Sequence, residues 1–251
     1  MFLIAEAGVN HGGKLDVAYL LADAAKYAGA DAVKYQLFNS QKLWGDDRIK
    51  HLELRFDDME KLYRHCNGIG IEFMCTPFGV EELTFLRPML QRVKIASGCI
   101  TRKPLLETAA ATGLPVILST GMSTRDEIGA AVDRFRADTT LLHCTSSYPC
   151  RLEDVNLKVL NSLWLFGCPV GYSDHTSGIT VSIAAVALGA VMIEKHLTLD
   201  RNGEGPDHAS SITPKELKAL RMAIGEVEAA LGDRQKRVLP CEVELRKAWR
   251  G

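Results

Sequence analysis

The feature that most constrains the fold is a regular alternation of short apolar runs with longer amphipathic segments. Several of the amphipathic segments end in glycine, which commonly terminates a helix. Thr124 and Glu127 have the spacing of a capping box at the start of one such helix. Alternation of this kind favours a parallel sheet, and eight strands favour closure into a single (β/α)8 TIM barrel, an α/β fold. The strand-like runs are 2–8, 32–38, 71–78, 92–97, 115–120, 139–146, 169–176 and 191–199.

An open, doubly wound sheet is the alternative arrangement for alternating strands and helices. It would normally carry a glycine-rich phosphate loop directly after the first strand. Gly8, Gly12 and Gly13 do not form that fingerprint. The 251 residues fit one barrel, and no linker, repeat or low-complexity stretch divides them. We therefore predict a single domain over residues 1–251, in which the mixed-charge tail after about residue 233 has no assigned place.

Composition excludes several classes of protein. The formal net charge of −1 argues against a nucleic-acid partner, so any anion site must be local. The 7 cysteines are scattered without a CxxC pair, which favours reduced thiols over a disulfide framework or a zinc ribbon. The N-terminus MFLIAEAGVNHGG lacks the features of a signal peptide, and no apolar run approaches the roughly 20 residues that span a bilayer. We expect a cytoplasmic protein with no membrane partner.

Polar residues crowd the C-terminal ends of the predicted strands, where a barrel of this type places its active site. Residues two apart, such as Lys34 and Gln36 or Glu194 and His196, share one face of a strand. Any one of these groups can simply be satisfied by another inside the core, as in a buried Lys–Glu pair. A common ligand explains why every strand ends in this way. The set comprises Glu6, Asn10, His11, Lys34, Gln36, Thr76, Lys94, Ser97, Ser119, Thr120, His143, Thr145, Ser146, Tyr148, Ser173, Asp174, His175, Glu194 and His196.

The residue types indicate what such a ligand is. Lys34 and Lys94, together with several hydroxyl groups, form a set of donors that suits phosphate or carboxylate. A single histidine is more often a hydrogen-bonded core residue, but His175 and His196 end neighbouring strands and can share one divalent metal. A two-histidine site leaves coordination positions open for substrate and water. The hydroxyl groups are those of Thr76, Ser97, Ser119 and Ser173.

Nine short motifs carry a resemblance to a known family. Their order resembles that of the sialic acid synthase family, which includes synthases of related nonulosonic acids. The likeness extends from the first strand to about residue 217. The motifs are AEAGVNHGG, AVKYQLF, CTPF, VKIASG, ILSTGM, LLHCTSSYP, GYSDHT, IEKHLTLD and GPDHASSITPKEL.

The resemblance implies a reaction. Phosphoenolpyruvate and an N-acetylmannosamine-like sugar aldehyde give a nonulosonic 2-keto sugar acid and phosphate. In the family, C3 of phosphoenolpyruvate attacks the aldehyde carbon, water adds to C2, and the tetrahedral intermediate loses phosphate with C–O cleavage. A divalent metal, Mn²⁺ or Mg²⁺, polarises the aldehyde. Family members are commonly dimers, so a homodimer is also implied.

The resemblance also implies roles for individual residues. His175 and His196 are the expected metal ligands. Glu6 and Gln36 are expected near the reacting centre, so these four are the predicted catalytic residues. Tyr148, Ser146 and Asp207 are expected to face the sugar acceptor. The phosphoenolpyruvate anion is expected to contact Lys34, Thr76, Lys94, Ser97, Ser119 and Ser173.

The sequence departs from the family pattern on the acceptor side. The family usually has Glu or Asp after KIxSG, where this chain has Cys99, and often has Asn where this chain has Ser146. A neutral thiol accepts hydrogen bonds weakly, so we expect Cys99 to mark a changed acceptor pocket. The segment after the second strand is short, and the C-terminal antifreeze-like domain of many members is not expected here.

Two alternative functions remain open from the sequence. One is a related 3-deoxy sugar-acid synthase with a different aldehyde acceptor. A phosphorylated acceptor would call for extra basic residues, of which only Arg102 and Arg201 stand out. The other is a non-catalytic barrel that binds a sugar or phosphoenolpyruvate. The carboxylate missing at Cys99 favours this alternative, and the retained Glu6, lysines and histidines oppose it.

Overall fold

The computed structural model describes residues 1–135 and 138–250. Within these ranges the strands are β1 (Phe2–Gly8), β2 (Ala32–Leu37), β3 (Glu72–Pro77), β4 (Val93–Ile95), β5 (Val116–Ser119), β6 (Thr139–His143), β7 (Val170–Asp174) and β8 (Met192–His196). The α-helices are α1 (Leu15–Ala28), α2 (Ser40–Trp44), α3 (Phe56–Ile69), α4 (Val80–Leu86), α5 (Lys103–Ala111), α6 (Arg125–Val132), α7 (Val159–Leu163), α8 (Thr180–Ala187), α9 (Pro214–Leu231) and α10 (Val243–Arg250).

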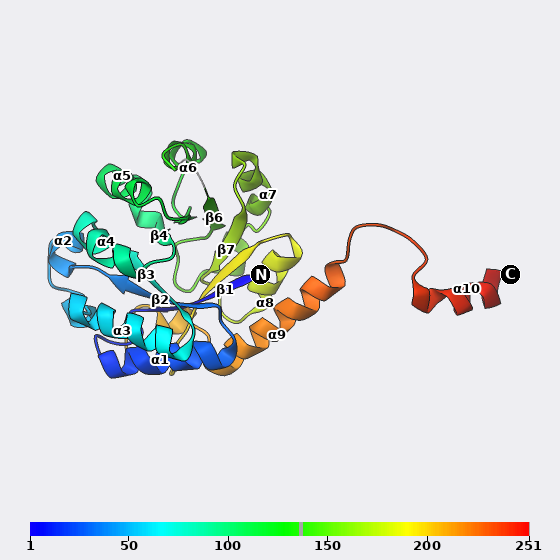
Figure 1. Cartoon of the computed structure of the whole chain (residues 1–251), viewed down its shortest axis with the longest axis horizontal. Helices are drawn as coiled ribbons and strands as arrows, with labels where there is room; N and C mark the ends of the chain where they lie inside the picture. The colour runs from blue at the N-terminus through cyan, green and yellow to red at the C-terminus, as the bar shows by residue number, and fades with distance from the viewer. Residues whose placement is uncertain (136–137, 251) are drawn as a thin grey trace.

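The strands form a parallel sheet that curls into a nearly closed barrel surrounded by helices (Figure 1). Their order is β3-β2-β1-β8-β7-β6-β5-β4, so the first strand pairs with the last. The remaining neighbours, β3 and β4, lie against each other without a hydrogen-bonded ladder. The predicted (β/α)8 barrel is therefore confirmed. Each strand lies within its predicted run, and the surplus predicted residues mostly belong to the loops that follow the strands.

Local sequence signals account for several helix boundaries. Helix α1 ends at Gly29 and α3 at Gly70, whose φ angles of 87° and 71° lie in the left-handed region that glycine adopts without strain. Thr124 caps α6 by accepting a hydrogen bond from the Glu127 backbone N–H, which confirms the predicted capping box.

The barrel interior has two layers because inward positions recur every second residue along a strand. One layer is a small apolar cluster formed by Ile4, Ala32, Met74, Ile117, Leu142 and Met192. Two residues further along β1, β2 and β8 stand Glu6, Lys34 and Glu194, all buried. The apolar layer plugs the barrel from below. The polar layer above it forms the floor of the site.

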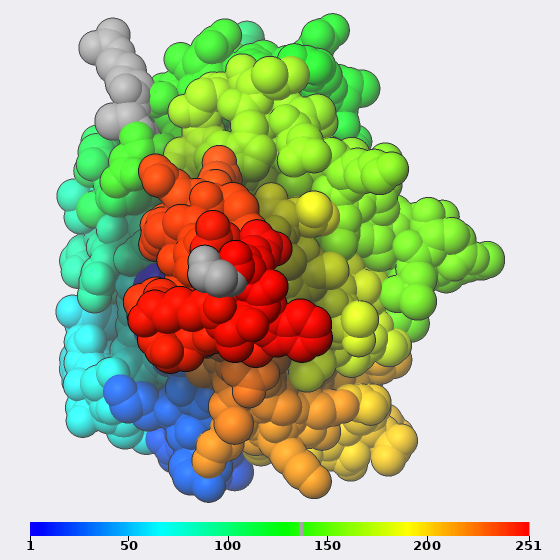
Figure 2. Space-filling view, turned by 90° about the vertical axis from the view of Figure 1, so that its right-hand side faces the viewer, coloured from blue at the N-terminus to red at the C-terminus, as the bar shows by residue number. Residues whose placement is uncertain are grey.

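The chain beyond α9 leaves the barrel. Figure 1 shows α10 separated from the barrel by a length of chain, and Figure 2 views the molecule from the side on which this tail lies. Helix α10 has no buried residue, and Trp249 is 82% exposed. Within the described residues, no helix combines the length and apolarity needed to cross a bilayer.

Candidate active site

A pocket of about 510 Å³ opens where the strands end. Pockets of this size commonly hold small organic molecules. The residues predicted to be catalytic, metal-binding or substrate-binding all line it: Glu6, Lys34, Gln36, Thr76, Lys94, Ser97, Ser119, Ser146, Tyr148, Ser173, His175, His196 and Asp207. The structure therefore brings together side chains from all eight strands or the loops after them. What each side chain does stays a prediction.

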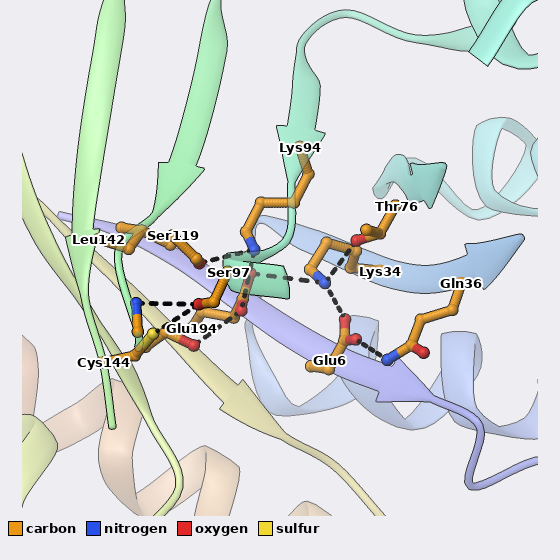
Figure 3. Close-up of polar contacts among 12 residues, drawn as sticks. Glu6, Lys34, Gln36, Thr76, Lys94, Ser97, Ser119, Leu142, Cys144 and Glu194 are labelled. Atoms are coloured by element: carbon orange, nitrogen blue, oxygen red, sulfur yellow. Dashed lines mark hydrogen bonds and ion pairs between the residues drawn. The ribbon is translucent and has the colours of Figure 1, made fainter. Parts of the chain in front are cut away.

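Four buried charges form the floor of the pocket, and we call Glu6, Lys34, Lys94 and Glu194 the inner cluster (Figure 3). The Lys34 Nζ lies 2.6 Å from Glu6 Oε2 and 3.6 Å from Glu194 Oε2. The Lys94 Nζ lies 3.6 Å from Glu194 Oε1. Glu194 Oε2 is buried and has no hydrogen-bond partner. Two ammonium groups thus face the pocket with only loose contacts to the carboxylate between them.

Hydroxyl groups from neighbouring strands complete the floor. Lys34 donates to Thr76 Oγ1 at 3.0 Å, and Lys94 donates to Ser119 Oγ at 2.8 Å. Ser173 donates to Glu194 Oε1 at 2.8 Å. Ser97 Oγ accepts the backbone N–H of residue 121 at 3.0 Å. These contacts aim the lysine side chains and the hydroxyls at the same space, which is an arrangement suited to an anion.

Electrostatics in the inner cluster are set by burial and by the opposing charges. Burial raises the pKa of the Glu6 carboxyl, since the Lys34 ammonium only partly offsets the cost of desolvation. Burial likewise lowers the pKa of the Lys94 ammonium. Glu194 differs because, despite its burial, Lys34, Lys94 and the Ser173 hydroxyl together hold its pKa below the usual value. The Glu194 carboxylate therefore stays ionised more readily than that of Glu6. The raised pKa of Glu6 makes its carboxylate the stronger base of the two.

The two predicted metal ligands meet at the ends of β7 and β8, with ring centroids 5.5 Å apart. The His175 Nδ1 lies 2.7 Å from the carbonyl oxygen of Thr145, so this nitrogen carries the proton. Burial, with the nearby His196 ring, lowers the pKa of His175 to about 4, so the ring is neutral at pH 7. Its Nε2 is 3.4 Å from Ser173 Oγ, whose hydrogen is used by Glu194. The Nε2 lone pair is consequently available to a cation.

The second histidine also has a free nitrogen. His196 Nδ1 is buried without a hydrogen bond, and Asp207 Oδ2 is 3.6 Å away. Buried nitrogens of this kind need a partner, which a divalent metal would supply. In the described part of the chain, no group of three or more His, Cys, Asp or Glu side chains converges in metal-binding geometry. The donors present fit a two-histidine site with open positions.

The predicted acceptor-side residues surround the histidines. The Tyr148 ring is 4.1 Å from the His175 ring and 5.7 Å from the His196 ring, measured between centroids. Gln36 donates to Glu6 Oε1 at 3.0 Å. Gly8 leaves room for Asp207, because a Cβ atom at that position would stand 3.0 Å from the Asp207 Oδ2. The rim of the pocket above the histidine pair thus carries hydrogen-bonding groups.

A second buried charged group lies behind the site, between β7, β8 and α8, and we call Asp174, Thr176, Ser182 and Lys195 the outer cluster. Lys195 Nζ lies 3.2 Å from Asp174 Oδ2 and donates to the Thr176 carbonyl at 2.5 Å. Asp174 also accepts from the Thr176 backbone N–H and from the Ser182 hydroxyl. The outer cluster does not line the pocket. It holds the turn that carries His175.

Some strand-end residues singled out from the sequence do not reach the pocket. Asn10, His11, Thr120, His143 and Thr145 are absent from its lining. Asn10 instead donates to the Leu197 carbonyl and the Ser211 hydroxyl, and His143 pairs with the Val155 carbonyl. These contacts of Asn10 and His143 fasten loops to the barrel.

The expectation that Cys99 faces the acceptor is wrong. The 3-10 turn Ser97–Cys99 directs its side chain into the main apolar core, where it is fully buried. Burial raises the pKa of the thiol, so the thiol is neutral. Gly98 lines the pocket at this point instead. A thiol tolerates such a core position because it behaves as a small apolar group, whereas a carboxylate would not.

Sequence reasoning gave no role to two groups of residues that line the pocket. The first is Glu194, although its spacing from His196 places both on one strand face. The second is an apolar side, made by the segment after β2 together with Val9 after β1 and Phe78 after β3. These residues have no distinguishing signal in the sequence because they resemble ordinary core. The apolar side comprises Val9, Phe38, Leu43, Trp44, Ile49, Leu52 and Phe78.

A parallel barrel with buried cations and paired histidines at the carboxyl ends of its strands defines an enzyme-type site. Residues 21–236 match the model of the NeuB family, and the chain belongs to that family. It is 42% identical to the N,N'-diacetyllegionaminic acid synthase of Legionella pneumophila, over 98% of this chain and 77% of that protein. It is 38% identical to the human N-acetylneuraminate-9-phosphate synthase, over 96% of this chain and 74% of that protein.

A solved structure agrees with these relatives. The N-acetylneuraminic acid synthetase of Leptospira borgpetersenii, determined in complex with citrate, superposes with a TM-score of 0.93 at 38% identity. The match covers 99% of this chain and 92% of that one. The resemblance to the sialic acid synthase family and the prediction of an enzyme of the synthase class are therefore confirmed.

Proposed function

We propose that this protein condenses phosphoenolpyruvate with a sugar aldehyde to give a nonulosonic 2-keto acid and phosphate. The observation that carries the proposal is the inner cluster, in which two buried lysines face an open pocket beside a pair of buried histidines. Membership of the NeuB family supports the same reaction class. The synthases named among the relatives differ in their products, so the pocket itself must indicate the acceptor.

Phosphoenolpyruvate suits the floor of the pocket. It carries a phosphate and a carboxylate, and each needs charge-assisted hydrogen bonds when it is removed from water. Lys34 and Lys94 supply the ammonium groups, and Thr76, Ser97, Ser119 and Ser173 supply the hydroxyls. In the absence of substrate Glu194 occupies the space between the lysines and keeps the floor electrically balanced. The lysines are thereby held in place for an incoming anion.

His175 and His196 are the residues that would hold a divalent metal, Mn²⁺ or Mg²⁺. The free Nε2 of His175, whose ring is held by the bond from Nδ1 to the Thr145 carbonyl, and the unpartnered Nδ1 of His196 support this assignment. Such an ion, when bound, polarises the aldehyde carbonyl of the acceptor as a Lewis acid. The histidine pair lies beside Tyr148, so the same residues place the aldehyde over the floor of the pocket.

The bonds that form and break in the reaction indicate roles for Glu6 and Gln36. C3 of phosphoenolpyruvate forms a bond to the aldehyde carbon, and water adds at C2. Loss of phosphate by cleavage of the C2–O bond then leaves the 2-keto acid. Glu6 is placed to accept the proton of that water, because burial raises the pKa of its carboxyl and makes it a stronger base. Gln36 holds the Glu6 side chain through its amide N–H.

The state of the cysteines bears on the compartment of the protein. The cysteines of the chain are free, and most are buried, which is expected of a protein that stays in a reducing environment. We propose a cytoplasmic location on this ground.

Phosphate release from phosphoenolpyruvate tests the proposed function. The purified protein with Mn²⁺ is given phosphoenolpyruvate and N-acetylmannosamine or a related N-acylated sugar aldehyde. We expect phosphate to appear only when aldehyde is present, with a product whose mass equals both substrates plus water minus phosphoric acid. Binding of phosphoenolpyruvate without any aldehyde-dependent phosphate release would instead indicate a non-catalytic binding barrel.

A further inference from the structure

The two histidines of the pocket lie one residue beyond the point where the β7–β8 ladder ends. The last register pair of that ladder is Asp174 with Lys195, and each of these residues immediately precedes one of the histidines. Strand β7 ends at Asp174, so His175 already belongs to a loop, whereas His196 is the last residue of β8. The 5.5 Å between the two ring centroids therefore depends on what fixes the chain around the strand ends.

The outer cluster fixes the two strand ends from the side that faces away from the pocket. Side chains alternate along a strand, so Asp174 and Lys195 point outward where the neighbouring histidines point into the pocket. Lys195 Nζ lies 3.2 Å from Asp174 Oδ2, and both side chains are completely buried. An ion pair shielded from water thus joins β7 to β8 directly before the two histidines.

The same ion pair also fixes the turn that follows His175. The backbone N–H and the hydroxyl of Thr176 both donate to Asp174 Oδ1 at 2.8 Å, and the Thr176 carbonyl accepts from Lys195 Nζ. On the opposite side the carbonyl of His175 accepts the backbone N–H of Cys150 at 2.9 Å. The backbone of His175 is consequently held both by the outer cluster and by the loop after β6.

Stability alone is a poor reason for a completely buried ion pair. The cost of removing two charges from water can exceed the free energy gained from their attraction, and apolar residues of similar volume are often at least as stabilising. A charged pair with directional bonds does, however, fix where the neighbouring backbone atoms lie. Groups behind a metal ligand commonly act in this way, by orienting the ligand.

We propose that Asp174 and Lys195 are positioning residues, which set the separation and direction of His175 and His196 and thereby the affinity of the histidine pair for a divalent metal. The inference rests on the proposed function, because it concerns the metal ligands of the same site. It assigns a share of the metal affinity to two side chains that do not line the pocket. Replacing groups that orient metal ligands typically weakens metal binding by roughly 10- to 100-fold.

Calorimetric titration of Mn²⁺ into the substrate-free protein tests the inference. Lys195→Met should weaken Mn²⁺ binding by roughly 10- to 100-fold, while the Kd for phosphoenolpyruvate, measured without metal, stays unchanged. Arg92→Met is the matched control, because Arg92 pairs at 2.8 Å with Glu72, the first residue of β3, at the other end of the barrel. Its Mn²⁺ affinity should equal that of the parent protein. Unchanged Mn²⁺ affinity in Lys195→Met, or an equal loss in Arg92→Met, overturns the inference.

A double variant separates positioning from stability. Lys195→Met alone leaves a buried carboxylate without its counter-charge, and adding Asp174→Asn removes that charge and should recover part of the lost stability. Mn²⁺ affinity should nevertheless stay as low as in Lys195→Met, because the bonds from Lys195 to Asp174 and to the Thr176 carbonyl are still missing. Recovery of Mn²⁺ affinity together with stability overturns the inference and leaves the proposed function intact. Absence of Mn²⁺ binding in the parent protein overturns the proposed metal ligands as well.

Discussion

The inner and outer clusters meet on β8, where Glu194 and Lys195 are consecutive residues, and they differ in how their charged atoms are paired. Ser173 faces Glu194 in the β7–β8 register, and one residue further on Asp174 faces Lys195. In the outer cluster, the charged atoms are paired, and Lys195 and Asp174 are completely buried. In the inner cluster Glu194 Oε2 is without a hydrogen bond, and next to it His196 Nδ1 is too. Buried polar atoms are rarely left unpaired, so the difference separates a site that awaits a ligand from a structural support.

The alternation of a strand produces this contrast. Successive side chains point to opposite faces, so a shift of one residue moves a charge from the pocket to the space beneath α8. The outer cluster fixes the backbone at Thr176, next to His175. The inner cluster faces the pocket, where we propose that it binds the substrate. Substitutions in the two clusters should therefore have different consequences.

The largest effect is expected at the histidine pair. His175→Ala and His196→Ala should each reduce turnover by more than about 10²-fold, the upper loss typical of residues that merely support a metal ligand. The fold should survive, because neither ring contributes to the main core. Metal content by mass spectrometry checks the cause. Full metal occupancy in the double variant would contradict the assignment.

The next effect is on stability and belongs to the outer cluster. Lys195→Met leaves the Asp174 carboxylate buried without its counter-charge, which should lower the free energy of unfolding by about 3–5 kcal/mol. Denaturant titration measures this change. Lys61→Met is a control, since that lysine pairs with Asp58 while 47% of its side chain remains exposed, and it should cost about 1 kcal/mol or less. Equal losses in the two variants would show that the outer cluster gives no special support.

The smallest effect is expected at Cys99. Cys99→Ser buries a hydroxyl in the apolar core and should cost roughly 1–3 kcal/mol of stability. Turnover and acceptor ranking should stay close to those of the parent protein, because the side chain does not reach the pocket. Kinetic assays below the melting transition separate the two quantities. Inactivation in a folded, metal-binding variant would mean that the thiol takes part in the chemistry.

The sequence predicted the barrel and the residues around its pocket because strand ends carry a strong signal. Lys34 and Gln36 are two residues apart, as are Glu194 and His196, so each pair is predicted to share one face of its strand. Asp174 is also a polar residue at a strand end. Its neighbours Ser173 and His175 line the pocket, so the alternation of side chains along the strand directs Asp174 outward. The direction of Cys99 could not be predicted, because it depends on a single tight turn after β4. The apolar side of the pocket could not be predicted either, since Leu43 and Ile49 join it only when the segment after β2 packs against Val9 in the loop after β1.

One measurement compares the two clusters most directly, namely calorimetric titration of phosphoenolpyruvate into Lys94→Met and Lys195→Met. Both substitutions replace a buried lysine with an apolar side chain of similar length. Loss of a charge-assisted contact in the inner cluster should weaken binding by about 1.5–3 kcal/mol, or roughly 10- to 150-fold in Kd. Binding to folded Lys195→Met should match the parent protein. Equal affinity for phosphoenolpyruvate in Lys94→Met and the parent would contradict the account, because the inner cluster would then be as structural as the outer one.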